Sequence, residues 1–120
     1  MTTVRGIRGA TTVTSNEKNE IIAATKELLQ KIVKDNAVAV ADIASVLFSS
    51  TPGLNAEFPA VAAREIGWQD TPLMCMQELA VPGSLANCIR VLLLVNTDKK
   101  QAEIKHVYLR EAVNLRGDQR

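Results

Sequence analysis

The sequence predicts a single α/β (α+β) domain in which a mixed sheet of about five strands carries its helices on one face. Apolar segments of strand length alternate with two segments of helical periodicity, and no repeat or linker interrupts them. The 120 residues are enough for one hydrophobic core. Hydrophobic residues make up 47% of the chain and aromatic residues only 3%, so this core must be aliphatic.

The first two predicted elements are a strand and a long helix. Residues 4–13 form the strand, which ends in the β-branched run Thr11-Thr12-Val13. The helix covers residues 16–35, because Thr14 and Glu17 fit a capping box at its start. Apolar residues then recur at helical spacing as far as Ile32, and Asp35-Asn36 follows as the stop.

The second half of the chain predicts one more helix and several strands. Residues 41–47 fit either a short helix capped by Asp42 or a strand that leads into residues 48–50. Thr51-Pro52-Gly53 is a turn, and a helix begins near Phe58 with Pro59 at its first position and ends at Gly67. The remaining predicted strands are residues 73–77, 88–95 and 104–113, with a break at Pro82-Gly83.

Composition excludes several classes of function. The formal net charge is +1 and no basic run exceeds two residues, which argues against nucleic acid as a partner. No apolar stretch approaches the ~20 residues that span a bilayer, and no signal peptide opens the chain, so a cytoplasmic protein is expected. We expect Cys75 and Cys88 to be reduced and buried, and one histidine without a CxxC motif predicts no metal site.

Arg90 points most clearly to a function. It interrupts the apolar strand 88–95, where burying an unpaired guanidinium costs several kcal/mol. Two interpretations fit: a structural ion pair with Glu78 or another carboxylate, or recognition of an anionic small molecule. Arg8 lies in a second predicted strand and favours the anion pocket, because one ion pair would not account for both guanidinium groups.

The sequence lacks the residues that covalent catalysis, phosphate-loop binding and metal hydrolysis require. Neither cysteine has the surroundings of a thiolate nucleophile. His106 has no triad partner and is expected at the surface. Tyr108 either directs its hydroxyl into a pocket or is a half-buried residue of the sheet. Any reaction here would depend on positioned charges and hydrogen bonds alone.

Seven segments, collinear over nearly the whole chain, resemble the monofunctional chorismate mutase family of the Bacillus subtilis type. No single segment decides the matter, and their shared order carries the resemblance. The segments are Arg5-Gly6-Ile7-Arg8-Gly9-Ala10-Thr11-Thr12-Val13, Phe58-Pro59-Ala60, Arg64-Glu65, Gly67-Trp68-Gln69, Cys75-Met76-Gln77-Glu78, Cys88-Ile89-Arg90-Val91 and His106-Val107-Tyr108-Leu109.

This resemblance implies a homotrimer that looks like a pseudo-α/β-barrel, with active sites at the subunit interfaces. The implied reaction is the Claisen rearrangement of chorismate to prephenate, on the route to phenylalanine and tyrosine. It is a unimolecular step without cofactor, metal or covalent intermediate, which agrees with the catalytic machinery that the sequence lacks. The expected partners are chorismate, prephenate and further copies of the chain.

By the same resemblance, Arg90 stabilises the negative charge that grows on the breaking ether oxygen. Arg8 and Tyr108 match positions that bind the enolpyruvyl carboxylate, and Glu78 and Cys75 match the pair that meets the ring hydroxyl. Strand alternation puts Cys75 and Glu78 on opposite sides, so a shared site requires the strand to bulge or to end near Gln77. The other expected substrate-binding residues are Met74, Met76 and Gln77 beside them, Phe58, Ala60 and Arg64 from the neighbouring subunit, and Leu115 and Arg116 in the segment that closes over the site.

The chain departs from the family pattern at a few positions. Val61 stands where the Bacillus enzyme has a lysine, Met74 where it has a threonine, and one residue is deleted just before Gly67. The chain also stops at Arg120, which predicts a short tail. Two other functions would share this fold: a trimeric binder of a small carboxylate metabolite, and a structural trimer whose charged residues form an intersubunit salt-bridge network.

Overall fold

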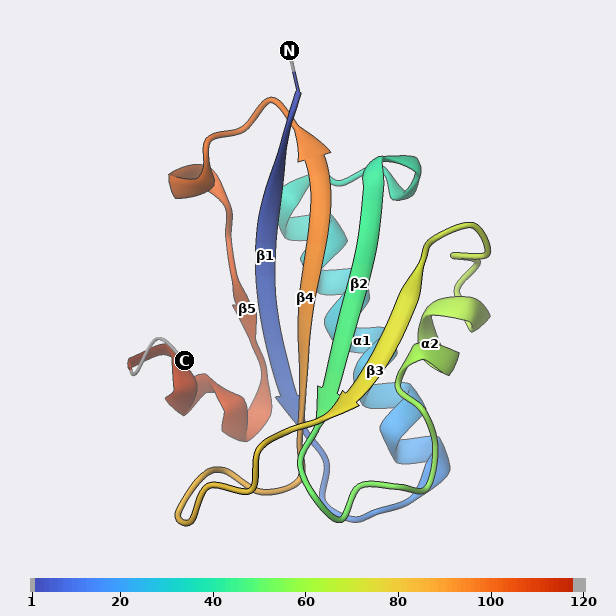
Figure 1. The fold of residues 1–120 in the computed structure, drawn as a ribbon, viewed down its shortest axis with the longest axis vertical. Helices are drawn as coiled ribbons and strands as arrows, with labels where there is room; N and C mark the ends of the chain where they lie inside the picture. The colour runs from blue at the N-terminus through green and yellow to red at the C-terminus, as the bar shows by residue number, and fades with distance from the viewer. Residues whose placement is uncertain (1, 118–120) are drawn as a thin grey trace.

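The computed structural model describes residues 2–117, and their side chains as far as Leu115 (Figure 1). Three 3₁₀ segments, Val40–Asp42, Gln101–Glu103 and Arg110–Gly117, join or follow the regular elements. These elements are the strands β1 Thr3–Thr12, β2 Ile43–Ser50, β3 Leu73–Gln77, β4 Cys88–Thr97 and β5 Val107–Tyr108, and the helices α1 Lys18–Asn36 and α2 Ala60–Glu65.

The five strands form one mixed sheet in the order β3-β2-β4-β1-β5, which confirms the predicted fold class. β4 is antiparallel to both of its neighbours, β1 and β2. β3 runs parallel to β2 at one edge, and β5 runs parallel to β1 at the other. The strand that carries Arg90 is therefore central and paired along both sides.

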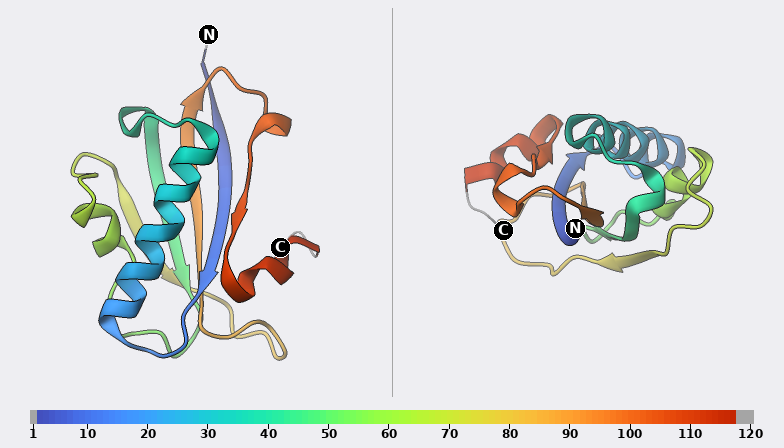
Figure 2. Two further views of the ribbon diagram at one scale, coloured as in Figure 1. Left: turned by 180° about the vertical axis from the view of Figure 1, so that it is seen from behind. Right: turned by 90° about the horizontal axis from the view of Figure 1, so that it is seen from above.

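The helices cover one face of the sheet and leave the other uncovered (Figures 1 and 2). α1 lies along the sheet behind the strands of Figure 1, and α2 lies beside β3. Between α1 and the strands is an aliphatic core in which Leu28, Leu29 and Ile32 meet Ile7 and Leu93. All five are fully buried. The opposite face of the sheet carries a hollow whose lining includes Arg8, Ser49 and Arg90.

α1 begins with a different set of caps from the predicted capping box. Glu17 is itself the N-cap, and its carboxylate accepts hydrogen bonds from the N–H groups of Asn19 and Glu20. Glu20 then reaches back to the backbone and hydroxyl groups of Thr14 and Ser15 at 2.6–3.2 Å. The predicted partners were wrong because Glu20, instead of Glu17, accepts the Thr14 N–H, while Glu17 accepts the free N–H groups of the first turn. Ala37, in the left-handed conformation, ends the helix.

Two further predictions are resolved or corrected by the structure. The ambiguous segment 41–47 is the end of a 3₁₀ turn followed by β2, and Pro59 precedes the first turn of α2 as its N-cap. The expected last strand over 104–113 was too long, since β5 covers only Val107–Tyr108. Arg110 adopts φ 55°, in the left-handed region, which ends the strand and starts the 3₁₀ segment.

Both cysteines are free thiols, as predicted. Cys88 is buried, but Cys75 is only half-buried because β3 is an edge strand. None of the helices that the structure describes has the length and apolar character needed to cross a membrane.

Candidate active site

Arg90 lies on β4 in the middle of the sheet, with Ala10 of β1 and Ser49 of β2 as its register partners. Its neighbours Ile89 and Val91 are buried on the helix-covered face, so alternation turns Arg90 toward the uncovered face. The flanking strands bury much of its side chain and leave 25% exposed. The sequence predicted an apolar environment on both faces, whereas only one face of β4 is covered within the chain.

Glu78 meets Arg90 from the end of β3. The Glu78 N–H donates to Ser50 O at 2.8 Å, and this hydrogen bond holds Glu78 at the end of β2. The Glu78 Oε1 atom accepts a hydrogen bond from Ser49 Oγ at 2.9 Å and lies 3.3 Å from Arg90 Nε. Nε is buried and forms no hydrogen bond with a described residue, so its attraction to Glu78 is electrostatic. The ion pair anticipated from the sequence is present within one chain.

A hollow of about 260 Å³ opens on the uncovered face next to this ion pair. Two cationic side chains line it, Arg90 from β4 and Arg8 from the neighbouring β1. Arg8 and Arg90 bring two guanidinium groups to the lining of the hollow, which favours an anionic ligand. The other predicted site residues that line it are Met76, Tyr108 and Leu115.

A second and larger hollow, of about 520 Å³, lies at the edge of the sheet. It is lined by Phe58, Cys75, Met76 and Gln77 together with the loop that follows β2. Phe58 is 64% exposed, which is unusual for an aromatic side chain. This combination of an exposed ring and an apolar concavity marks a surface suited to binding.

Three of the remaining predicted site residues, Ala60, Arg64 and Met74, line neither of these two hollows. Ala60 and Arg64 belong to α2, where Ala60 is buried and Arg64 is exposed. Met74 points to the uncovered face of β3 and is 58% exposed. Arg116 belongs to the last 3₁₀ segment, and its side chain is outside the described part of the chain.

Cys75 and Glu78 do not meet within one chain. Cys75 is the register partner of Phe48 on the helix-covered side of β3, whereas Glu78 turns to Ser49 and Arg90 on the other side. The strand ends at Gln77, as the sequence allowed, but its end does not bring Cys75 around to the carboxylate. Of the residues in the predicted site, Met76 is the one that lines both hollows.

Both thiols are held in their protonated form. Burial raises the pKa of Cys75, an effect that the N–H of Ala60 and the charge of Arg64 reduce but do not cancel. Burial also raises the pKa of Cys88, with Arg90 opposing the shift and Glu78 adding to it. A protonated thiol is a weak hydrogen-bond donor and a poor nucleophile. The geometry therefore gives no support to covalent catalysis by either cysteine.

Sequence reasoning missed two residues that hold this arrangement together. Ser49 donates to the carboxylate of Glu78, and assigning residues 43–50 to a strand would have placed it beside Arg90. His106 is exposed, as predicted, yet its Nδ1 atom accepts the backbone N–H of Arg8 at 2.9 Å. The local sequence gave no signal for this second bond, because it joins residues far apart in the chain.

Comparison with known proteins agrees with the geometry. A family model described as chorismate mutase type I matches residues 4–119. The chain belongs to the type I chorismate mutase family. It is 51% identical to chorismate mutase AroH of Bacillus subtilis over 116 residues, which are 96% of this chain and 91% of that protein. It is 50% identical to the AroH protein of Thermus thermophilus over 116 residues, 96% and 95% of the two chains.

A solved member of the type I chorismate mutase family has the same fold. The chorismate mutase from Clostridium thermocellum superposes with a TM-score of 0.90 and 52% identity, covering 91% of this chain and 97% of that one. Identity and coverage are both high, so the likeness extends over nearly the whole fold described above.

Proposed function

We propose that this protein is a chorismate mutase that converts chorismate to prephenate without a cofactor. The observation that carries the proposal is the hollow on the uncovered face, where Arg8 and Arg90 from adjacent strands meet in a chain of this family. Chorismate is a dianion, so two fixed guanidinium groups match its charge. Cys75 and Cys88 are protonated and are not activated nucleophiles, in keeping with a pericyclic reaction that needs none.

Arg90 supplies the electrostatic part of catalysis in this proposal. As the C–O bond of chorismate breaks ahead of C–C formation, negative charge grows on the ether oxygen. A guanidinium fixed in the sheet stabilises that charge more in the transition state than in the ground state, and this difference accelerates the reaction. Glu78, which accepts a hydrogen bond from Ser49, holds Arg90 from one side, so the guanidinium needs little reorganisation as the charge develops.

The other residues bind and shape the substrate. Arg8 and Tyr108 bind the enolpyruvyl carboxylate, and Glu78 meets the ring hydroxyl while it offsets the charge of the arginines. Met76 and Leu115 form apolar walls of the same hollow. Confinement of the substrate in the chair-like conformer supplies the remaining part of the rate enhancement.

We further propose that each site is completed by a second copy of the chain in a homotrimer. The predicted site residues divide between two hollows that one chain does not unite: Phe58 and Cys75 belong to the hollow at the sheet edge, Arg8 and Arg90 to the other. Exposed apolar side chains on the sheet edge and on the uncovered face, such as Met74 and Leu92, support contact with another copy. In the complete site, Phe58, Ala60, Arg64, Met74, Cys75 and Gln77 come from one subunit, and Arg116 closes the site from the subunit of Arg90.

A structural trimer has less support. In that alternative the charged residues form a network between subunits, but the Arg90–Glu78 pair is formed within one chain. A cytoplasmic location stays a prediction.

The first test follows the loss of the diene absorbance of chorismate in the presence of purified protein, without added cofactor or metal. Turnover far above the spontaneous rate is expected. A folded protein that leaves chorismate unchanged at the spontaneous rate would contradict the proposed reaction and favour a binder of carboxylate metabolites.

Mixing two impaired variants tests the shared site. Arg90→Ala and Arg64→Ala each damage one half of it, and we expect each to lower activity when assayed alone. After the two variants are unfolded and refolded together, about a quarter of the sites in a random equimolar trimer would combine two intact halves. Activity of the mixture well above that of both parents is expected. Activity that stays at the mean of the parents would place both halves on one chain.

A further inference from the structure

The outer edge of β1 is closed mainly by side chains. β5 pairs with β1 through only two register positions, Gly9 with Val107 and Ala10 with Tyr108. Further along the edge, the amide of Gln101 takes the place of a strand, since its Oε1 accepts the Gly6 N–H at 3.1 Å and its Nε2 donates to Gly6 O at 2.7 Å. Between these two attachments, the N–H of Arg8 donates to His106 Nδ1 at 2.9 Å.

The identity of the donor fixes the state of the imidazole. A backbone N–H can only donate, so Nδ1 of His106 carries the lone pair and the proton of the neutral ring is on Nε2. His106 is exposed, so its ring contributes little to the core, and its contact with Arg8 is the specific feature of its position. A side chain of any type would fill this surface, but few would present an acceptor to that N–H.

The segment that carries His106 is also held from the helix side. The buried Asn36, at the end of α1, accepts the N–H of Lys105 at 2.8 Å and donates to Lys105 O at 2.9 Å. Asn36 thus ties the segment to α1 just before His106 ties it to β1. Two residues further along, Tyr108 lines the hollow that Arg8 also lines. The His106 contact therefore adds, to the short pairing of β5 with β1, a hydrogen bond to the backbone of Arg8 itself.

We propose that His106 is a positioning residue: by accepting the N–H of Arg8, it fixes Arg8 and Tyr108 relative to each other on the two sides of one carboxylate of the substrate. The proposal rests on the proposed function, which assigns Arg8 and Tyr108 to that carboxylate. The carboxylate keeps its charge from ground state to transition state, so misplacing its two partners weakens both states alike. The consequence is a raised KM with little change in kcat, unlike the loss of kcat expected for Arg90.

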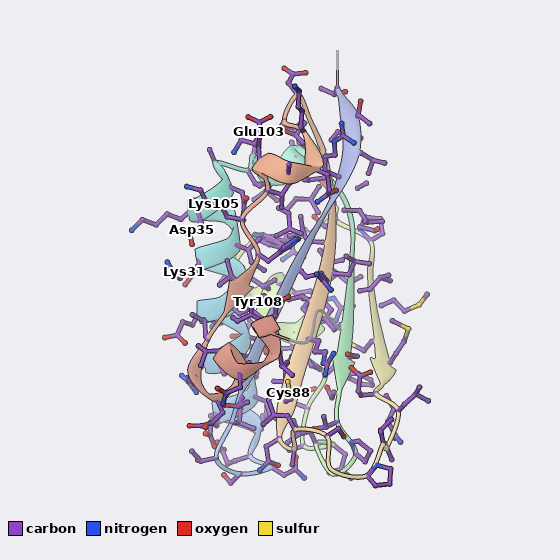
Figure 3. All side chains as sticks on the ribbon, turned by 90° about the vertical axis from the view of Figure 1, so that its left-hand side faces the viewer. Lys31, Asp35, Cys88, Glu103, Lys105 and Tyr108 are labelled. Atoms are coloured by element: carbon purple, nitrogen blue, oxygen red, sulfur yellow. The ribbon has the colours of Figure 1, made fainter. Side chains whose placement is uncertain are left out.

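Acid should disrupt the same contact. Protonation of His106 puts an N–H on Nδ1 against the N–H of Arg8. Partial desolvation of the ring, and secondly the charge of Arg8, lower the pKa of His106 from its ordinary value of 6.5. His106 has Glu103 and Lys105 on its own segment, and α1, which Asn36 ties to Lys105, carries Lys31 and Asp35, paired with each other at 3.1 Å (Figure 3). The contact is complete above pH 6.5 and is lost as the pH falls through the lowered pKa.

Two substitutions of His106 separate the acceptor from the bulk of the side chain. His106→Leu keeps an apolar side chain but has no acceptor, and it should raise KM for chorismate about five- to tenfold with kcat within about twofold. His106→Asn places Oδ1 near the position of Nδ1, and it should keep KM within about twofold of the wild-type value. The wild-type KM should rise as the pH falls from 6.5, and that of His106→Asn should stay level, because its amide does not titrate.

Gln101→Leu is the matched control, because it removes two hydrogen bonds from the same edge of β1 further from the hollow. It should lower stability while leaving KM unchanged. An unchanged KM in His106→Leu, or an equal rise in KM in Gln101→Leu, would overturn the proposal.

Hydrogen exchange of the Arg8 amide in the substrate-free protein gives a readout that does not depend on the reaction. Exchange should be faster in His106→Leu than in the wild type and His106→Asn. Equal exchange rates in all three proteins would refute the contact itself. If exchange follows this order while no protein turns over chorismate, the proposed function fails and the assignment of a carboxylate between Arg8 and Tyr108 fails with it.

Discussion

The two faces of β4 serve different purposes although their residues alternate along one strand. Ile89, Leu93 and Val95 point to the helix-covered face and are at most 2% exposed. Arg90 and Leu92 point to the other face, where Arg90 is 25% and Leu92 is 36% exposed. The first set builds a core that fixes the backbone, and the second set uses that fixed backbone to hold charge in position. A central strand can thus place a guanidinium more exactly than a loop could.

β1 repeats the same division. Arg8 lines the hollow, whereas Gly9 lies under α1, where a Cβ atom would come within 2.7 Å of Ile32 Cδ1 and 3.1 Å of Leu28 Cδ1. The helix therefore packs tightly against the sheet beside the residue that presents the second guanidinium. The tight packing at Gly9 on one face thus fixes the backbone from which Arg8 projects into the hollow on the other face.

Arg90→Ala, on the uncovered face of β4, should give the largest effect on kcat and leave the fold intact. Loss of the guanidinium should lower kcat by about 10³-fold or more, since one preorganised oxyanion donor alone is worth 10²–10³ and this donor is charged. Steady-state kinetics, with circular dichroism and the solution mass as folding controls, measure this effect. Arg90→Lys should recover little, because an ammonium lacks the planar set of donors. A rate near wild type for Arg90→Ala would refute the electrostatic role.

Leu93→Ala is the corresponding change on the covered face. Leu93 is fully buried, and removing its side chain should lower the free energy of unfolding by about 2 to 5 kcal/mol. The kcat of the folded protein should change little. Urea unfolding at fixed protein concentration measures the stability, with Leu92→Ala as the open-face comparison. A larger loss of stability in Leu92→Ala than in Leu93→Ala would reverse the assignment of the two faces.

Gly9→Ala and Gly6→Ala compare the faces of β1 with one added methyl group each. At Gly9 the new Cβ would overlap side chains from α1, so a loss of about 1 to 3 kcal/mol is expected. At Gly6 the nearest atom, Leu92 Cδ1, is 3.4 Å away, and the change should stay within about 0.5 kcal/mol. Thermal unfolding of the two variants in parallel gives the comparison, and equal losses would show that the two faces are packed alike.

Ser49→Ala should give the smallest effect. It removes the hydroxyl that donates to Glu78, and the change in unfolding free energy should be about 1 kcal/mol or less. The value of kcat/KM should fall about fivefold, because Glu78 then holds Arg90 less firmly. Ser49→Thr, which retains the hydroxyl, is the control. A kcat/KM unchanged in Ser49→Ala would show that Glu78 needs no second partner.

The sequence allowed good predictions where a residue contradicts its local pattern. Arg90 in an apolar strand indicated a charged partner, and the structure provides Glu78 as that partner and Arg8 in the same hollow. Predictions failed or stayed open where two local interactions compete, as at the start of α1, or where a left-handed residue ends a strand, as at Arg110. Propensity does not resolve such cases, because it does not say which of several possible hydrogen bonds or backbone conformations the chain adopts.

The sequence by itself determined the order of the elements, the aliphatic core and the presence of arginines that require anionic partners, because these follow from periodicity and from the cost of burying charge. Only the tertiary structure decided that Ser49 supports Glu78, that His106 meets the N–H of Arg8, and that Cys75 faces away from Arg90. Each of these depends on the register between strands or on a hydrogen bond between residues far apart in the chain. Such relations are set by how the whole sheet packs, and no local stretch of sequence contains them.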